Sequence, residues 1–299
     1  MKRELSAKWR MWQQKVTNMA EYLVLSAGSK EFPIALKKVA ESRKIKEVVF
    51  RPLLIDACIA IEDDGFTVYV GCEREKIEDS YRRWNDVNDG GRSLSNRTRF
   101  TIAHEICHTF FFRIEEKGFR RYIDTKHHKT LKSMERACDK AAARMLLPEP
   151  LLRIEVERID ILDAQGFVSL RKKAVVSVEC LLYRVEESSV WNQDLGAIAY
   201  VRKQDGKFLI KELIIHPILR NIFPKAVKGE TARNLIYDDR LSIYGGYERK
   251  VVIEKPVLVG SRQATQRFRV TCERISEYVD SFILTVRSEG QPKIVERTR

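Results

Sequence analysis

The stretch Phe100-Thr-Ile-Ala-His-Glu-Ile-Cys-His-Thr-Phe110 contains the pattern H-E-x-x-H and decides the interpretation of this chain. On a helix, His104 and His108 lie four residues apart and therefore on one face, where two imidazoles can bind one zinc ion at about 2.0–2.1 Å. Glu105 points about 100° away around the same helix. It can stand beside the metal without binding it and accept a proton from a zinc-bound water, as a zinc hydrolase requires.

A catalytic zinc site takes three protein ligands and keeps one position open, so a third ligand is needed. The stretch Glu135-Arg-Ala-Cys-Asp139 supplies the candidate, because a second helix packed across the first can bring Glu135 to the metal. Asp139 lies one turn later on the same face and can accept the N–H of a zinc-bound histidine, which fixes its tautomer. Taken alone, each of these acidic residues is also compatible with an exposed helix surface.

Other interpretations exist for the residues around the motif. Packing or capping histidines are disfavoured, because the flanking apolar residues predict a buried helix in which unpaired imidazoles are costly. Cys107 points to the helix's other side, which favours a buried, unreactive thiol over a sensor of oxidants. In the polar stretch 113–132, candidates for an oxyanion stabiliser are Tyr122, His127 and His128, with a solvated basic loop as the alternative.

Two blocks of sequence, Arg99 to His108 and Glu135 to Pro148, together resemble the ImmA/IrrE family of zinc metallopeptidases. The family pattern is R-F-T-x-A-H-E-x-x-H followed by E-x-x-A-N/D-x-F-A-A-x-L-L-x-P, and the resemblance covers roughly residues 20–150, with weaker support to 190. It implies a zinc-dependent endopeptidase whose three ligands and general base are, in order, His104, His108, Glu135 and Glu105. It also implies cleavage of a protein substrate, a transcriptional repressor, in a stress-response or mobile-element regulatory system.

The chain departs from the family pattern at three positions. Cys107 stands where a glycine is usual, Cys138 replaces the alanine and Ala141 replaces the phenylalanine. All three are packing positions, so these departures bear on the fine geometry of the site and not on its ligands.

The composition of the 299 residues, 44% hydrophobic and 32% charged, is typical of a globular protein and excludes a disordered or fibrous one. No run approaches the roughly 18 apolar residues of a membrane span, and the start MKRELSAKWRMWQQ lacks the apolar segment of a signal peptide. The six cysteines are scattered without a C-x-x-C pair, which favours reduced thiols. We therefore expect a cytoplasmic protein that does not contact membranes.

Outward from the motif, the chain is predicted to be α+β. Apolar residues at a spacing near 3.6 predict helices over 3–26 and 34–42. Short β-rich runs follow at 47–50, 57–61 and 66–70. A helix from Thr98 through Phe112 carries the motif, and another begins with Ser133 as its N-cap. We assign these elements to a zincin-like peptidase domain with a small sheet, residues 1–157.

Residues 158–192 are predicted to form a helix-turn-helix-like segment. Two short helical patterns are separated by Val176-Ser177, with Ser177 as an N-cap. The second pattern, Ser177–Glu187, contains one Arg and three Glu, whereas a DNA recognition helix normally carries surplus Lys or Arg. A structural or protein-docking role is therefore favoured over nucleic-acid binding.

Residues 193–299 are predicted to form a separate β-rich α+β domain that regulates the peptidase or recruits its substrate. The β-type runs are 196–201, 208–215, 251–259 and 282–286. The segment holds 20 basic and 13 acidic residues within a chain of net charge +13, which favours acidic partners. A basic face is suggested by the close recurrence of Arg262, Arg267, Arg269 and Arg274, with an ordinary solvated surface as the alternative.

Two functions of different classes follow from these patterns. The first is a zinc endopeptidase, and the second is a nucleic-acid-binding transcriptional regulator whose zinc site is structural. Glu105 discriminates between them, because a structural site has no use for a general base and closes with four ligands, usually including cysteine. Cys107 and Cys138 stand at offsets unsuited to such a closed site.

Overall fold

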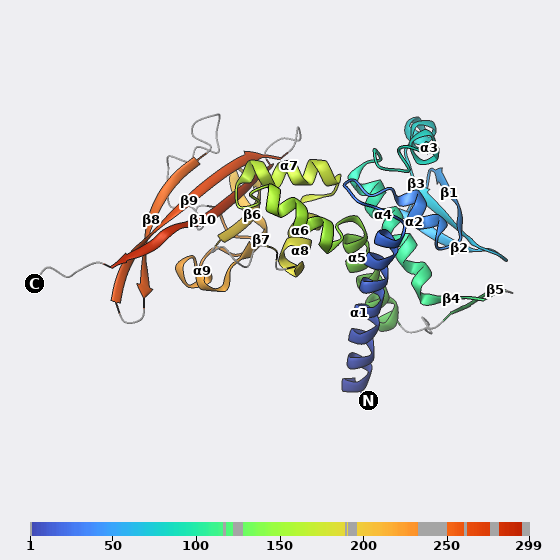
Figure 1. Ribbon diagram of the computed structural model, residues 1–299, viewed down its shortest axis with the longest axis horizontal. Coiled ribbons are helices and arrows are strands. Elements are labelled where there is room, and N and C mark those ends of the chain that lie inside the picture. Colours follow the sequence, from blue (N-terminus) through green and yellow to red (C-terminus); the bar gives the residue numbers. More distant parts are fainter. Residues whose placement is uncertain are drawn as a thin grey trace, which may run out of the picture. The chain divides into compact units, whose positions relative to one another are not determined.

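The computed structural model of the chain describes residues 2–115, 118–121, 128–188, 190, 196–232, 250–259, 262–275 and 281–294. The chain divides into two compact units, which we describe separately. The first unit comprises Met1–Leu152 and Lys173–Leu181, and the second comprises Arg153–Lys172 and Leu182–Arg299. Helices and small sheets make up both units, so the predicted α+β class is confirmed (Figure 1). Within the described residues, no helix is both long and apolar enough to cross a membrane.

The first half of the chain alternates helices with short strands. Its elements are, in order, α1 (Lys2–Ser26), α2 (Leu36–Glu41), β1 (Ile45–Arg51), β2 (Ala57–Ile61), β3 (Phe66–Gly71), α3 (Ile77–Asn85), α4 (Asn96–His108), β4 (Phe112–Glu115), β5 (Gly118–Arg121) and α5 (His128–Leu146). The helices α6 (Glu149–Arg158), α7 (Ala164–Ala174) and α8 (Val178–Ser188) follow. The helices and strands predicted before residue 71 are therefore confirmed, whereas α3 was not predicted.

A three-stranded sheet supports one side of α4. Its strand order is β1-β3-β2, with β1 parallel and β2 antiparallel to β3. The turn Asp63-Asp64-Gly65 joins β2 to β3, and the N–H of Glu62 donates to the carbonyl of Gly65 at 3.0 Å. Helix α4 packs against β2 and β3, so the sheet holds the motif helix from this side.

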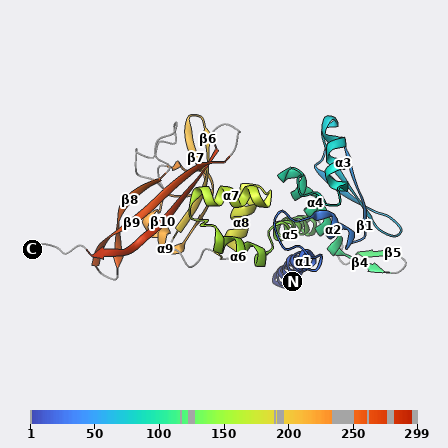
Figure 2. The same cartoon turned by 45° about the horizontal axis from the view of Figure 1, so that its top comes forward.

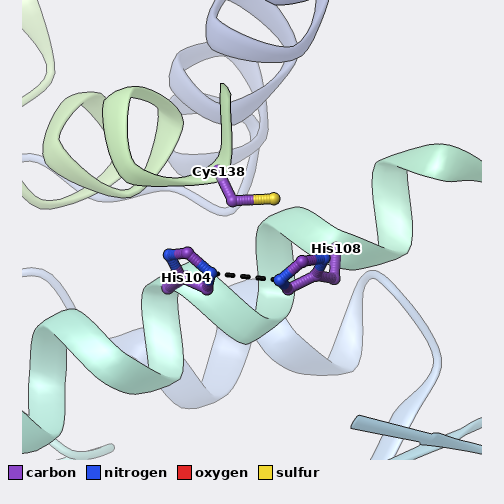
Figure 3. Close-up of side chains that lie close together, drawn as sticks. All are labelled: His104, His108 and Cys138. Carbon is purple, nitrogen blue, oxygen red and sulfur yellow. Dashed lines mark hydrogen bonds between the residues drawn. The ribbon is translucent and has the colours of Figure 1, made fainter. Parts of the chain in front are cut away.

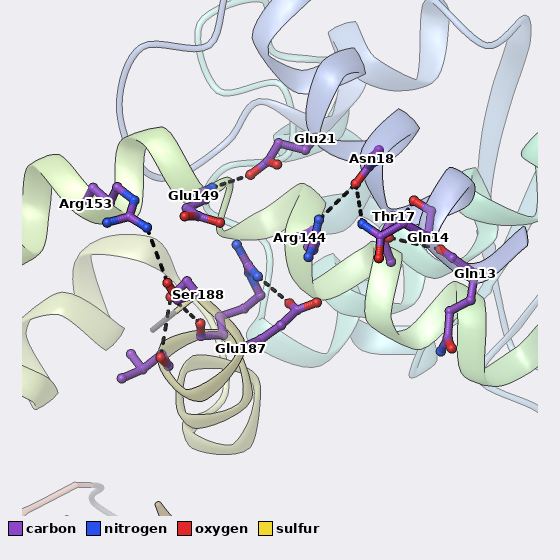
Figure 4. A network of polar contacts seen from close by, with 12 residues as sticks. Gln13, Gln14, Thr17, Asn18, Glu21, Arg144, Glu149, Arg153, Glu187 and Ser188 are labelled. Carbon is purple, nitrogen blue, oxygen red and sulfur yellow. Dashed lines mark hydrogen bonds and ion pairs between the residues drawn. The ribbon is translucent and has the colours of Figure 1, made fainter. Parts of the chain in front are cut away.

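Helices α1 and α5 lie side by side and form the other side of the first unit (Figures 1 and 2). The face of α1 toward the core buries Val16, Ala20 and Val24 completely. Polar contacts flank this apolar face, because Arg144 of α5 donates to Asn18 of α1 at 3.2 Å (Figure 4). Helix α1 thus supports α5 on the flank that α4 does not cover.

Helix α4 begins at an N-cap and is anchored by a buried arginine. The Oγ of Ser95 accepts the N–H of Thr98 at 3.2 Å, which satisfies one of the free donors of the first turn. Arg99 has no exposed surface and donates to the carbonyls of Gly91 and Ile34 at 2.7 and 3.0 Å. Burial lowers the pKa of Arg99 to about 10, which is still well above neutral pH. The guanidinium therefore stays charged and ties α4 to two loops.

The same helix ends earlier than predicted. Arg43 donates to the carbonyl of Thr109 at 2.8 Å and to its Oγ1 at 2.9 Å. The guanidinium takes the place of the N–H that a further turn would supply, and its positive charge suits a helix C-terminus. After a single 3-10 turn, the chain enters β4 at Phe112. The predicted extension of this helix through Phe112 is therefore wrong.

Helix α5 starts earlier than predicted and ends where predicted. It begins at His128, so the expected start at Ser133 is wrong. Leu131 and Lys132 favour helix, and they extend α5 upstream of the predicted cap. The helix ends at Leu146, shortly before Pro148, since the residue before a proline is disfavoured in helical conformation.

The buried side of α5 is built from small side chains. Buried positions along it include Ala137, Ala141, Ala142 and Ala143, each at most 3% exposed. The distance between packed helices depends on the size of the side chains between them. Alanines therefore let α4 approach α5 closely enough for short side chains to meet across the two helices.

The second unit contains a five-stranded antiparallel sheet. Its elements are β6 (Gly196–Gln204), β7 (Lys207–Ile215), α9 (Pro217–Ile222), β8 (Lys250–Val259), β9 (Arg262–Arg274) and β10 (Ser281–Ile294), and the strand order is β7-β6-β10-β9-β8 (Figure 2). Asp205 and Gly206, both at positive φ, form the tight turn from β6 to β7. The four predicted strands are confirmed. Strand β9 was not predicted, because its arginines mask the alternation of Phe268 and Val270.

Residues 153–172 pack on this sheet. The N–H of Ala164, at the start of α7, donates to the Oγ1 of Thr271 on β9 at 2.8 Å. Arg287 on β10 pairs with Asp160 at 2.8 Å. Gly166 is required here, because a Cβ atom would lie 2.1 Å from the carbonyl oxygen of Asp160. The domain boundaries predicted near residues 157 and 192 are boundaries between parts that fold independently. Independent folding is not tested by the contacts within each unit, so these boundaries stay predictions.

The predicted basic face of residues 193–299 rests on four arginines of β9. On a strand, neighbouring side chains alternate between two sides, so Arg267 and Arg269 fall on one side of β9 and Arg274 on the other. Arg267 pairs with Glu254 at 2.9 Å, and Arg269 pairs with Glu289. Alternation and acidic partners therefore divide and partly neutralise three of the four arginines, which disfavours one basic face. The side chain of Arg262 is not described, so the expectation for the whole group stays a prediction.

The two helices predicted between residues 168 and 187 are present as α7 and α8. Ser177 caps α8, because its Oγ accepts the N–H of Cys180 at 3.1 Å. Later in α8, the fully buried Arg184 pairs with Glu187, and the hydroxyl of Ser188 donates to the Arg184 carbonyl at 2.6 Å. Arg184 is therefore buried and does not lie on the surface of α8.

Candidate metal centre

Three predicted ligands from two helices converge on one point. The Nε2 of His104 lies 3.0 Å from the Nε2 of His108, and both nitrogens come from α4 (Figure 3). The Oε2 of Glu135, from α5, lies 3.0 Å from the first nitrogen and 3.5 Å from the second. The three polar atoms therefore form a triangle with nearly equal sides.

The size of this triangle fits a zinc ion. With metal–ligand bonds of about 2.0–2.1 Å, tetrahedral coordination separates neighbouring ligand atoms by about 3.3 Å. The sides of 3.0, 3.0 and 3.5 Å bracket this value. Two imidazole nitrogens and a carboxylate oxygen are also donors that zinc prefers. The residues present thus fit the metal that the sequence predicts.

Asp139 lies where a supporting residue is expected. Its Oδ1 is 2.9 Å from the Nδ1 of His104, opposite the nitrogen that faces Glu135. Burial lowers the pKa of His104, but the hydrogen bonds to Asp139 and Glu135 outweigh it and raise the pKa to about 9. Hydrogen bonds from His104 and His108 hold the pKa of Glu135 well below its usual range. The carboxylates therefore favour a positive charge at this point, whether a proton or a metal ion supplies it.

Glu105 stands next to this centre and does not belong to the triangle. Its residue surface is 7% exposed, and burial raises its pKa. The charges of His104 and His108 act on it in the opposite direction. A carboxylate held this way, between two candidate ligands in sequence, can exchange protons with a group at the metal position.

The structure also brings a cysteine to the centre that the sequence interpretation treated as a packing residue. The Sγ of Cys138 and one ring nitrogen each of His104 and His108 lie within 4.8 Å of one another (Figure 3). Burial raises the pKa of the Cys138 thiol well above its usual value. The signal in the sequence was its spacing, because Cys138 follows Glu135 by three residues and so shares its side of α5.

The remaining candidates give mixed results. Cys107 is fully buried and burial raises the pKa of its thiol, which confirms the predicted buried position and agrees with low reactivity. The oxyanion candidates Tyr122 and His127 lie outside the described residues, and the side chain of His128 is not described. Their proposed role stays a prediction.

Comparison with known proteins finds a family match over the part of the chain that contains α4 and α5. Residues 92–186 match the family model Peptidase_M78, described as the IrrE N-terminal-like domain. The predicted resemblance to the ImmA/IrrE family is confirmed. Because this is a family of metallopeptidases, a metal ion is expected at the IrrE-like site, and the matched range includes all candidate ligands.

Two individual proteins show how far the IrrE likeness extends. The radiation response metalloprotease IrrE of Deinococcus radiodurans is 29% identical over 103 residues, which are 34% of this chain and 30% of that protein. The matched part is therefore less than a third of the relative. A solved transcriptional regulator of Mycobacterium tuberculosis is 12% identical with a TM-score of 0.39, over 92% of this chain and 76% of that chain.

Proposed function

We propose that the chain is a zinc-dependent endopeptidase that cleaves a protein substrate. The observation that supports it most is the triangle of His104, His108 and Glu135, with the buried Glu105 close enough to interact electrostatically with both histidines. A structural metal site requires only ligands, whereas hydrolysis requires a base next to an open position. The match to a metallopeptidase family over the same residues supports this reading of the geometry.

Each residue has a separate task in the proposed reaction. A bound zinc ion would polarise the substrate carbonyl and make a water molecule more acidic. Glu105 accepts the proton of the attacking water and passes it to the leaving amine, so it acts first as a base and then as an acid. Asp139 orients the ring of His104 through its Nδ1, so that the Nε2 faces the metal position.

The proposal includes the wider organisation of the chain. Residues 1–157 form the zincin-like peptidase domain, 158–192 a helix-turn-helix-like segment that docks protein, and 193–299 a domain that regulates cleavage or recruits the substrate. The substrate is a transcriptional repressor in a stress-response or mobile-element system, and the reaction takes place in the cytoplasm. These parts of the proposal rest on the sequence patterns and on the family resemblance.

Co-expression with a repressor-like protein encoded nearby tests the proposal. We expect a cleaved fragment with the unaltered chain, and reversible loss of cleavage on chelation. Glu105→Gln keeps the size and hydrogen bonding of the side chain but removes the base, so cleavage should fall by at least about 10²-fold with zinc content unchanged. Glu78→Gln, an exposed carboxylate on α3, is the matched control and should cleave normally. Full cleavage by Glu105→Gln would contradict the proposed role of this residue.

A second candidate function is a nucleic-acid-binding regulator with a structural zinc site. One observation favours it, the presence of Cys138 beside the two histidines, since structural zinc sites usually include cysteine. The pairing of Arg267 and Arg269 with glutamates speaks against it, because paired arginines neutralise fewer phosphates. If Glu105→Gln leaves every cellular phenotype intact while charge reversal at both arginines abolishes it, the second candidate replaces the first.

A further inference from the structure

Helix α5 presents two different metal-binding groups to the same pair of histidines. Glu135 contributes a carboxylate oxygen at 3.0 and 3.5 Å from the two Nε2 atoms. Cys138, one turn further along α5, contributes a sulfur that groups with the same two rings within 4.8 Å (Figure 3). The candidate centre therefore has four potential ligands, whereas an open hydrolytic site uses three protein ligands.

The distances allow the sulfur to reach a metal held by the histidines. A zinc–sulfur bond of about 2.3 Å and a zinc–nitrogen bond of about 2.0–2.1 Å place sulfur and nitrogen about 3.6 Å apart in a tetrahedral site. Because the cluster spans no more than 4.8 Å, the sulfur needs to approach the metal position by at most about 1 Å. Its thiol makes no hydrogen bond to any residue that the structure describes, so no such contact holds it away from the metal.

We propose that Cys138 is a displaceable fourth ligand, which closes the metal centre when no substrate is bound. This inference rests on the proposed function and adds a form of regulation to it. On closing, the S–H bond breaks, its proton leaves to solvent, a zinc–sulfur bond forms and the position for water is lost. On opening, the zinc–sulfur bond breaks, the sulfur takes up a proton from solvent and the position becomes free for water. No electrons are transferred in either direction.

The other residues of the site favour Cys138 as a displaceable ligand over Cys138 as a permanent one. A permanently bound sulfur would give a closed site, in which the carboxylate of Glu105 beside the centre would have no partner for proton transfer. Glu135 completes three ligands without any help from sulfur. Cys138 is therefore an additional ligand and not a replacement for the carboxylate.

Cobalt substitution of the full-length protein tests this inference without a substrate. Cobalt(II) occupies zinc sites, and a bound thiolate adds an intense near-ultraviolet charge-transfer band to its spectrum. We expect one cobalt per chain and this band in the unaltered protein and in Cys107→Ala, which removes a second buried thiol outside the cluster. In Cys138→Ala and Cys138→Ser the band should be absent while cobalt remains bound, with affinity lowered at least about 10-fold. Serine keeps the size of the side chain, and circular dichroism shows whether each variant folds.

A small competing ligand then tests whether the sulfur can be displaced. Acetohydroxamate, which binds metals through two oxygens, should bleach the thiolate band of the unaltered cobalt protein. A band that persists when acetohydroxamate has bound would overturn displacement. One bound cobalt without any thiolate band, or a band lost in Cys107→Ala and kept in Cys138→Ala, would overturn the inference but leave the proposed metal centre intact. Failure of the unaltered protein to bind cobalt or zinc at all would overturn the proposed function and this inference together.

Discussion

Helices α4 and α5 build the candidate centre in different ways. The side chains of His104 and His108 on α4 are 15% and 13% exposed, whereas those of Glu135 and Asp139 on α5 are 43% and 56% exposed. The α4 side chains are therefore held by the surrounding core before any metal binds. The α5 carboxylates are held mainly by their contacts to the histidines, and their position depends on how the two helices pack.

This difference shows that α4 supplies the residues by which the candidate site can be recognised, whereas α5 supplies the third ligand that completes it. Two histidines and a base within five residues can be recognised without any knowledge of the fold, because their geometry is set by the α-helix alone. The third ligand requires two helices to meet at the correct height and rotation. Changes on α4 should thus act directly on metal binding, and changes on α5 should act through packing as well.

Removal of ligands should give the largest effects. His108→Ala removes a nitrogen that nothing else on α4 replaces, so zinc affinity should fall by more than the 10–100-fold that is typical for loss of a supporting residue. Glu135→Ala should lower affinity at least about 10-fold, and less than His108→Ala, because Cys138 remains nearby. Competition with a chromophoric chelator measures both. Unchanged affinity in either variant would remove that residue from the ligand set.

Enlargement of a buried alanine should change the spacing between α5 and its neighbours, and so weaken zinc binding, without altering a ligand. Ala142 is fully buried and lies seven residues after Glu135, so both share one side of α5. Ala142→Leu should cost about 1–3 kcal/mol of stability through overpacking and should also weaken zinc binding. Denaturant unfolding and chelator competition report the two effects. Arg136→Leu, on the exposed side of the same helix, is the control, and equal zinc affinity in both variants would show that helix spacing does not matter.

The sequence predicted the shared helix of the three motif residues better than it predicted where the surrounding helices begin and end. The spacing of His104, Glu105 and His108 is a local property, and the structure places all three on α4 as expected. The end of that helix was misplaced, because Arg43, far away in the sequence, caps Thr109. Contacts between distant residues do not appear in local periodicity, and such contacts decide where helices begin and end.

The same argument explains what was missed elsewhere. Cys138 was taken as a packing residue because it replaces the alanine of the family pattern, and its distance to two histidines on another helix does not appear in the sequence. Strand β9 was missed because only Phe268 and Val270 mark its buried face among many polar residues. In both cases the deciding neighbour is supplied by the fold and does not appear in the local sequence.

Loss of the residue that orients His104 should have a smaller effect than loss of a ligand. Asp139→Ala removes the acceptor 2.9 Å from the Nδ1 of His104, so zinc affinity should fall by about 10–100-fold. Asp139→Asn keeps an oxygen in place, so its zinc affinity should lie between that of Asp139→Ala and that of the unaltered protein. Asp163→Ala, a carboxylate of the second unit, controls for loss of charge. An Asp139→Ala variant with unchanged affinity would return this residue to the exposed surface of α5.

The smallest effect should come from the start of α4, and it tests whether that helix is held by its core. Ser95→Ala removes the acceptor for the N–H of Thr98, so the helix should lose about 1 kcal/mol of stability. Zinc affinity should change less than about twofold, because Arg99 still anchors the helix and the histidines lie beyond the first turn. Ser95→Asp keeps an acceptor and adds a favourable charge, so it should restore protection of the Thr98 amide in hydrogen exchange. If Ser95→Ala instead weakened zinc binding as strongly as Asp139→Ala does, the α4 side chains would depend on the helix end as well, and the contrast between the two helices would disappear.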